Sequence, residues 1–223
     1  NNGRVFLFLV KLLMEQNAPQ MFRAKKAAPY RLIVGMTGAS GAILGIRLLE
    51  TLKSTPIETH LILSEHASLT ITQETNLQPD EVHCLANFTY DFHNIGASIA
   101  SGSFDTLGMV IIPCSIKTLS AVANSYTDDL ISRAADVTLK EGRKLVLVVR
   151  ETPLHAGHLR LMREAALAGA VIFPPVPAFY VRPRSVDEII DNTVGRILLR
   201  MGIENSLYHE WQGHPPGNND EPA

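Results

Sequence analysis

The sequence predicts an α/β fold: a doubly wound, mostly parallel sheet with helices on both faces, arranged in three layers. Short apolar strands alternate with helical patterns along the chain, at a spacing typical of parallel strands joined by right-handed crossovers. The predicted strand at residues 145–149 is apolar throughout, as expected of a strand that is covered on both sides. A glycine-rich turn joins the first strand to the first helix, at the edge where α/β sheets bind ligands.

The predicted elements follow one another without an internal repeat or a domain linker. The first strand, residues 32–34, leads through the glycine-rich turn into a helix at 43–52, where apolar side chains recur at helical spacing. A proline at an early position starts a short helix at 79–86. The other strands are predicted at 59–63, 109–112, 145–149 and 171–173, and the other helices at 67–74, 117–124, 130–141, 159–167 and 186–201.

The composition fits one compact domain, which we assign to residues 31–205. The chain has 223 residues, 46% of them apolar, and a net charge of −2. A sizeable core is therefore expected, and nucleic acid is not an expected partner. The eight histidines are scattered, and no carboxylate completes a metal set with His155 and His158, so no metal site is predicted.

The two ends of the chain differ from the predicted domain. Residues 1–30 carry an apolar run that is broken by Lys11 and is followed by several basic residues. This run is shorter than the roughly 20 residues that a membrane span needs. We interpret 1–30 as a leader, a tag or an additional helix, with an organellar presequence as the alternative. The expected location is the cytoplasm, or an organelle such as the mitochondrion in that alternative. Residues 206–223 are interpreted as a C-terminal tail.

The glycine-rich turn indicates a phosphate site. Gly35, Gly38 and Gly41 are spaced G-x-x-G-x-x-G, which is close to the dinucleotide fingerprint without matching it. No acidic residue clearly ends the second strand to hold a ribose, because Ser64 stands there with Glu65 next. A mononucleotide is therefore favoured over a nicotinamide dinucleotide. Tight packing alone is the alternative explanation of the glycines.

Two further segments follow predicted strands. Ser115-Ile-Lys-Thr118 opens a helix, where its hydroxyl and N–H groups suit a phosphate or the polar edge of a ring, or where Ser115 is simply a helix cap. Arg150 and Glu151 follow the strand at 145–149, which places a fixed cation and a proton carrier at the same edge of the sheet. A surface salt bridge is the alternative for this pair.

Tyr180 ends a proline-rich segment that would hold its hydroxyl in a fixed position, or is a buried aromatic residue with a satisfied hydroxyl.

These segments resemble the flavin prenyltransferases, the UbiX/Pad family, over about residues 31–213. The resemblance rests on long motifs, among them GMTGASGA (35–42), GMVIIPCSIKTLS (108–120), RETPLHAGHLRLM (150–162) and PPVPAFY (174–180). It is nearest to the bacterial members. It implies a flavodoxin-like, Rossmann-like sheet, a homo-oligomer that is a dodecamer, and sites at the interfaces between subunits.

The resemblance also implies which residues form the site. The positions that match FMN-binding residues are Gly38, Ala39, Ser40, Ser64, Ser115, Ile116, Lys117, Thr118 and Arg150. Those that match residues around the phosphate of dimethylallyl monophosphate are Lys140, Tyr180 and Arg196, with Arg133 and Glu74 nearby and Trp211 covering the site. Ser40 and Glu151 match a pair that handles a proton.

The implied reaction joins a dimethylallyl group to N5 and C6 of reduced FMN without a metal. Lys140, Tyr180 and Arg196 would stabilise the departing phosphate. The prenylated FMN would pass to a UbiD-type decarboxylase, as in ubiquinone biosynthesis or the decarboxylation of aromatic acids. The alternatives are an FMN-dependent decarboxylase of the cysteine decarboxylase type, for which His66 is a weak candidate for the catalytic histidine, and a non-catalytic flavin carrier.

Overall fold

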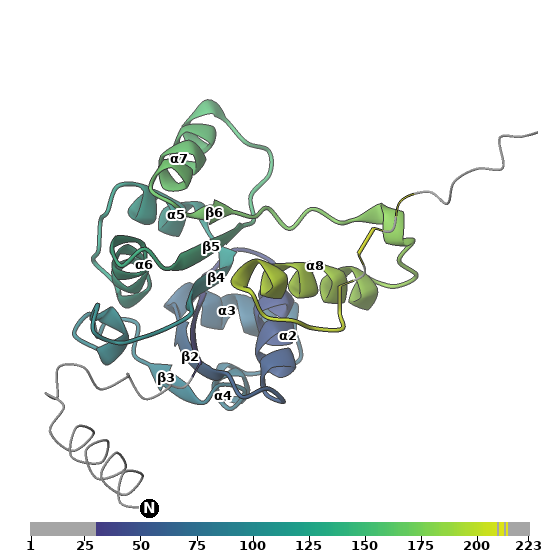
Figure 1. The fold of residues 1–223 in the computed structure, drawn as a ribbon, viewed down its shortest axis with the longest axis horizontal. Helices are drawn as coiled ribbons and strands as arrows, with labels where there is room; N and C mark the ends of the chain where they lie inside the picture. Colours follow the sequence, from purple (N-terminus) through teal and green to yellow (C-terminus); the bar gives the residue numbers. More distant parts are fainter. Residues whose placement is uncertain (1–29, 209, 212, 214–223) are drawn as a thin grey trace, which may run out of the picture.

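Six parallel strands form one sheet with helices on both faces (Figure 1), which confirms the predicted fold class. The computed structural model describes residues 30–208, 210, 211 and 213. The predicted extension up to residue 29 and most of the predicted tail lie outside the described residues. The strands are β1 (Arg31–Met36), β2 (Glu58–Leu63), β3 (Phe88–Tyr90), β4 (Gly108–Cys114), β5 (Lys144–Val149) and β6 (Val171–Ile172).

The helices divide between the two faces of the sheet (Figure 1). One face is covered mainly by α2 (Ala42–Leu52), α3 (Glu65–Glu74) and α8 (Val186–Met201). The other is covered by α5 (Ile116–Ala123), α6 (Leu130–Lys140) and α7 (Ala156–Leu167). The short elements are α4 (Pro79–His83) and the 3-10 turns η2 (Ser98–Ala100) and η3 (Phe179–Val181).

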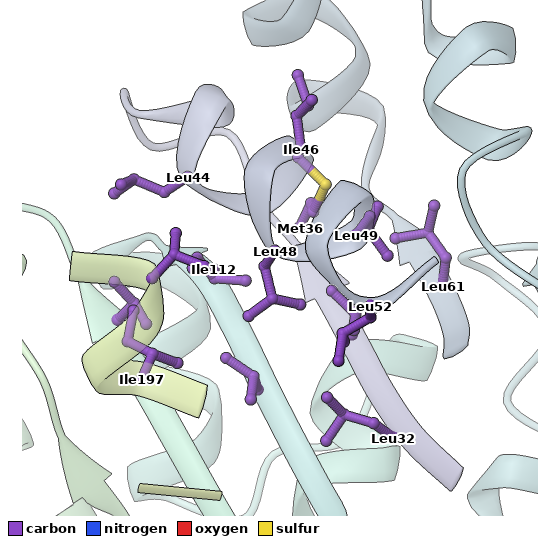
Figure 2. Close-up of a cluster of buried hydrophobic side chains, with 14 of the residues drawn as sticks. Leu32, Met36, Leu44, Ile46, Leu48, Leu49, Leu52, Leu61, Ile112 and Ile197 are labelled. Atoms are coloured by element: carbon purple, nitrogen blue, oxygen red, sulfur yellow. The ribbon is translucent and has the colours of Figure 1, made fainter. Parts of the chain in front are cut away.

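Each central strand sends alternate side chains into two separate cores. Leu32 and Met36 of β1 join the cluster beneath α2 and α8 (Figure 2), as does Val34, whereas Ile33 joins the cluster beneath α5 and α6. This alternation follows from the two-residue period of a strand. Because both faces are buried, the central strands are apolar at nearly every position, which is the pattern that predicted them.

The strand order β3-β2-β1-β4-β5-β6 creates the edge at which a site is expected. Without the short edge strand β3, the other five strands follow the flavodoxin order. After β1 the chain first builds outward through β2 and then returns to β4 on the other side of β1. The connections therefore diverge beyond the carboxyl ends of β1 and β4, and this switch point leaves a crevice where α/β folds bind ligands.

The structure differs from the predicted elements in a few places. The edge strand β3 was not predicted, because three residues are too few to establish an alternating pattern. The helix predicted at 159–167 begins at Ala156, since His155 caps it through Nδ1, which accepts the N–H of Gly157. The helix predicted at 79–86 already ends at His83.

We expect His60 to make the stability of the fold depend on pH. His60 is 2% exposed, stacks on Phe88 and contacts the hydroxyl of Tyr90 through Nδ1 at 2.9 Å. Its Nε2 has no hydrogen-bond partner, although Glu58 Oε2 lies 3.9 Å away. Burial, opposed by Glu58 and assisted by Arg31, lowers the pKa of His60 from 6.5 to about 4.

The folded state therefore binds this proton less readily than the unfolded state does. The stability that the neutral His60 contributes is present above pH 6.5 and is lost progressively as the pH drops from 6.5 towards 4. Between pH 7 and pH 4.5 the His60 contribution should fall by about 2 kcal/mol. Urea unfolding of His60→Gln should show a correspondingly smaller loss than the wild type over this range. Equal losses in both proteins would contradict the assignment.

Candidate functional site

A cavity of about 370 Å³ lies at the switch point, beyond the carboxyl ends of β1, β2 and β4. The turn after β1, the starts of α3 and α5 and the ring of Phe92 form its walls. Its lining residues are Thr37, Gly38, Ser64, Glu65, His66, Phe92, Ser115, Lys117 and Thr118. Five of the predicted FMN-binding residues are thus brought together here from segments that lie far apart in the sequence.

Two helices begin at this cavity, and a serine caps each of them. The hydroxyl of Ser64 accepts the N–H of Ala67 at 3.1 Å, and that of Ser115 accepts the N–H of Thr118 at 3.3 Å. The positive ends of both helix dipoles and their free N–H groups therefore face the same volume. The capping role expected of Ser115 is confirmed. Ile116 packs its side chain against the core beneath α5.

Thr37 ties the two sides of the switch point together. Its hydroxyl donates to the carbonyl of Pro113 and accepts the N–H of Ser115, both at 2.8 Å. The end of β1 is thereby fixed to the start of α5. Sequence reasoning did not select Thr37. The sequence offered one signal for Thr37: it is a hydroxyl residue between Gly35 and Gly38, in the turn that follows the first strand.

The glycines of the turn have packing and conformational reasons of their own. A Cβ at Gly38 would lie 2.4 Å from the Cβ of His66, so only glycine allows this approach of the turn to α3. Gly41 has a φ of 103° and caps α2 without a side chain. Ala39 is half-buried between them. These contacts support the packing explanation of the glycines, which is compatible with a ligand at the same turn.

Glu74 accepts hydrogen bonds from the end of the turn that leads into α2. Its carboxylate accepts the N–H groups of Gly41 at 2.8 Å and Ala42 at 3.1 Å, as well as the hydroxyl of Ser40. Partial burial by itself would raise the pKa of Glu74. The three hydrogen bonds and the nearby charge of Arg150 outweigh burial and lower it. Ser40, Glu74 and Arg150 therefore form one electrostatic group, and the carboxylate stays ionised at neutral pH.

The Lys117 ammonium is held in place at the mouth of the cavity. It donates to Asp129 Oδ2 at 2.7 Å and lies 5.8 Å from the centre of the Phe92 ring. Asp129 is 4% exposed and caps α6. The hydrogen bond to Asp129 is the main cause that raises the pKa of Lys117, so the cation persists at every physiological pH. Asp129 was not predicted as part of this arrangement.

A second group of predicted residues gathers where the chain leaves β6 and runs alongside α8 (Figure 1). The hydroxyl of Tyr180 lies 3.3 Å from that of Tyr208, and the Tyr180 ring meets Trp211 edge to face at 5.5 Å. The contact with Tyr208 is the main cause that raises the pKa of Tyr180, against the influence of Arg196. Tyr180 is therefore a protonated donor at neutral pH. Arg196 lines a cavity of about 240 Å³ beside this group.

The remaining predicted residues lie elsewhere on the protomer. Arg133 approaches Asp136 at 3.8 Å, and Lys140 pairs with Glu141. Both cations are on α6, on the opposite side of the molecule from the segment that carries Tyr180 (Figure 1). One chain therefore does not bring Lys140 to Tyr180. Glu151 is exposed and accepts the N–H of Thr152, whereas Ser40 donates to Glu74.

The cavity at the switch point fits a flavin mononucleotide in its chemistry. Apolar surface around Phe92 suits a planar ring, and the capped starts of α3 and α5 supply N–H groups and positive dipole ends for polar oxygens. Lys117 adds a fixed positive charge.

Among the described residues, no group of three or more histidine, cysteine or acidic side chains could hold a metal ion. No helix in the described part of the chain is long and apolar enough to cross a membrane.

We expect Ser115→Ala to weaken FMN binding about tenfold, because it removes one hydroxyl and disturbs the N–H groups that it orders. Loss of the cap should also lower the free energy of unfolding by about 1 kcal/mol. The matched control is Ser185→Ala. Ser185 caps α8 in the same way, at 3.2 Å from the N–H of Glu188, and is not among the lining residues of the cavity. Flavin titrations of both variants should separate the effects: equal FMN affinities would show that Ser115 is only a cap.

Comparison with known proteins identifies the family. A family model described as Flavoprotein matches residues 22–198. Flavin prenyltransferase UbiX of Escherichia coli (strain K12) is 60% identical over 186 residues, which cover 82% of this chain and 98% of the relative. "Flavin prenyltransferase PAD1, mitochondrial" of Saccharomyces cerevisiae is 45% identical over 213 residues, covering 95% of this chain and 88% of that protein.

Solved structures agree with these relatives. The structure of AnUbiX (PadA1) in complex with FMN and dimethylallyl pyrophosphate has a TM-score of 0.83 and 48% identity, and the match covers 84% of this chain and all of that one. A dodecameric FMN-dependent Ubix-like decarboxylase from Escherichia coli O157:H7 has a TM-score of 0.80 and 49% identity, with 82% and 100% covered. Sequence, fold and the geometry at the switch point lead to one conclusion: the chain belongs to the flavin prenyltransferase family.

Proposed function

We propose that this protein joins the dimethylallyl group of dimethylallyl monophosphate to N5 and C6 of reduced FMN, giving prenylated FMN. The observation that carries the proposal is the cavity at the switch point, in which two capped helix starts and Lys117 surround an apolar space. The relatives named flavin prenyltransferase support it, as does the related structure that holds FMN and dimethylallyl pyrophosphate together.

In this proposal one chain contributes the switch-point part of the flavin site. The flavin supplies the nucleophilic ring that accepts the prenyl group, and the protein binds and orients it. The proposed binding residues are Gly38, Ala39, Ser40, Ser64, Ser115, Ile116, Lys117, Thr118 and Arg150. Support comes from the five of them that line the cavity and from Arg150, whose charge reaches the Glu74 carboxylate beside Ser40.

The prenyl phosphate would be held by cations and a hydroxyl. Tyr180 would donate a hydrogen bond to a phosphate oxygen, and Arg196 would offset the negative charge that grows on the leaving phosphate. The raised pKa of Tyr180 supports the donor role, because the hydroxyl keeps its proton. Trp211, in ring contact with Tyr180, would cover the substrate. Glu74 would act through the turn that it anchors rather than through direct contact.

Lys140 and Arg133 would join this site from a second copy of the chain. Their position on α6, across the molecule from Tyr180 (Figure 1), supports an assembly in which α6 of one protomer faces the segment after β6 of another. The related dodecameric structure supports the same assembly state for this protein. We propose that residues 31–205 form the assembling domain, with 1–30 and 206–223 as its extension and tail.

Proton transfer would fall to Glu151 and Ser40. Glu151 is exposed at the end of β5, next to Arg150, where a carboxylate can accept a proton from the reacting ring. The hydroxyl of Ser40 donates a hydrogen bond to the ionised carboxylate of Glu74, which orients it. The product would be consumed by a UbiD-type decarboxylase, in ubiquinone biosynthesis or the decarboxylation of aromatic acids.

For the location we propose the cytoplasm, unless residues 1–30 direct import into an organelle. The organellar alternative is supported by the yeast relative, whose name includes the word mitochondrial and whose match extends over 95% of this chain. A fusion of residues 1–30 to a fluorescent protein distinguishes the two: diffuse fluorescence supports the cytoplasm, and fluorescence confined to mitochondria supports import.

The direct test is to mix the protein with reduced FMN and dimethylallyl monophosphate under anaerobic conditions. We expect the flavin to gain the mass of one five-carbon prenyl unit and a lasting change in its absorption spectrum. Glu151→Gln and Lys140→Ala should bind FMN with unchanged affinity and lose most of the turnover. Full turnover in both variants would contradict the roles assigned to Glu151 and Lys140, whereas an unmodified flavin with the wild type would contradict the proposal and favour a flavin carrier.

Mixed assemblies should restore activity if the site is shared between subunits. Lys140→Ala and Arg196→Ala should each be nearly inactive alone. When both variants are co-expressed in equal amounts, about a quarter of the sites should receive Lys140 from one copy and Arg196 from the other, and thus be complete. We expect about a quarter of the wild-type rate from the co-purified oligomer. An assembly that stays inactive would contradict a site in which Lys140 of one copy and Arg196 of another act together.

A further inference from the structure

The cavity that Arg196 lines has one wall that differs chemically from the others. Its volume is about 240 Å³, and it lies between α8 and the extended chain after β6. The extended chain contributes apolar surface from Phe173, Pro174 and Val176. The wall formed by α8 contributes polar side chains, namely Asn192, Thr193 and Arg196. The space is therefore apolar on one side and polar, with a positive charge, on the other.

Asn192 is the polar residue of this wall whose hydrogen bonds are incomplete. It is 6% exposed, and its Nδ2 has no hydrogen-bond partner among the described residues. Thr193, its neighbour, donates its hydroxyl to the carbonyl of Ile189 at 2.8 Å. Asn205, in the segment that follows α8, donates Nδ2 to the carbonyl of Gly195 at 2.9 Å. A buried amide without a partner costs free energy, which a bound acceptor would offset.

The position of Asn192 relates it to Arg196. The two residues are four apart on α8, so they lie on the same side of the helix one turn from each other. Both border the same cavity. A cation and a neutral N–H donor at this spacing suit two oxygens of one phosphate group, and the apolar wall opposite suits a short hydrocarbon chain.

We propose that Asn192 is a further binding residue for the prenyl phosphate, donating Nδ2 to a phosphate oxygen that Arg196 also contacts. This inference rests on the proposed function and adds a residue to its phosphate site. Asn192 also borders a larger cavity, of about 570 Å³, on its other side. The lining of the larger cavity includes Arg182 and Arg184 but also Glu188 and Asp191. Because charges of both signs are present, the larger cavity attracts an anion less strongly than the smaller one. The smaller cavity is the one whose charge favours a phosphate.

The test measures binding without turnover. Protein loaded with oxidised FMN is titrated calorimetrically with dimethylallyl monophosphate, and inorganic phosphate serves as a probe of the anion alone. Asn192→Leu should raise the dissociation constant for dimethylallyl monophosphate about tenfold, the usual effect of losing one hydrogen bond to a charged oxygen. FMN affinity should stay unchanged. The thermal unfolding midpoint should stay the same or rise, because leucine removes the unpaired amide.

Two variants accompany this measurement. Asn192→Asp keeps the shape of the side chain but places a carboxylate near the phosphate, so binding of dimethylallyl monophosphate should weaken by more than tenfold. If the leucine variant does not fold, the aspartate variant tests whether Asn192 contacts the phosphate. Asn124→Leu changes an exposed asparagine at the end of α5 and should bind dimethylallyl monophosphate as the wild type does.

The outcomes separate the two proposals. Wild-type affinity in both Asn192 variants would overturn the role of Asn192 while leaving the proposed function intact. A wild-type protein that binds FMN but neither binds nor consumes dimethylallyl monophosphate would overturn both. Weakened binding of inorganic phosphate in Asn192→Leu would assign the contact to the phosphate group, as proposed, whereas weakened binding of dimethylallyl monophosphate alone would assign Asn192 to the prenyl chain and contradict it.

Discussion

The parallel pairing of β1 with β4 is the constraint on which the rest of the site depends. It places the ends of two strands side by side although their residues are more than seventy positions apart in the sequence. Thr37 then locks the end of β1 to the start of α5 through two hydrogen bonds. Because the chain diverges to opposite sides of this point, the starts of α3 and α5 open towards a common space. The cavity is thus a consequence of strand order.

Much of this architecture could be predicted from the sequence because it depends on local patterns. Buried strands are apolar at nearly every position, and the cap at Ser115 directly follows such a strand, so both are visible in short windows. Pairings between distant residues are not visible in that way. The carboxylate of Glu74 anchors Gly41, and Asp129 holds Lys117; either contact requires the fold to be known. The family resemblance selected Glu74 and Lys117 by position, but neither partner in these bonds.

The predicted residues divide into two groups by the way in which the fold positions them. Of the residues expected to bind FMN, five converge on one cavity within the chain, because they stand just beyond the ends of neighbouring strands. The cations and the hydroxyl expected around the prenyl phosphate are split between α6 and, across the sheet, α8 with the segment beside it (Figure 1). A cation on an exposed helix face cannot reach across a packed domain. Either Lys140 acts at a contact between copies of the chain, or it does not act on this substrate.

This division has a physical consequence for how such a site can work. A phosphate leaving group needs several positive charges around it, and a single folded chain that buried them together would suffer their mutual repulsion before any ligand was present. If Arg196 and Lys140 reach the phosphate from two different protomers, the two cations stay apart within each chain, where Lys140 pairs with Glu141. The positive charges of Arg196 and Lys140 would then approach each other only at the contact between protomers, where the substrate phosphate would lie between them. Under this arrangement the switch-point residues act within one chain, whereas stabilising the departing phosphate requires the assembly.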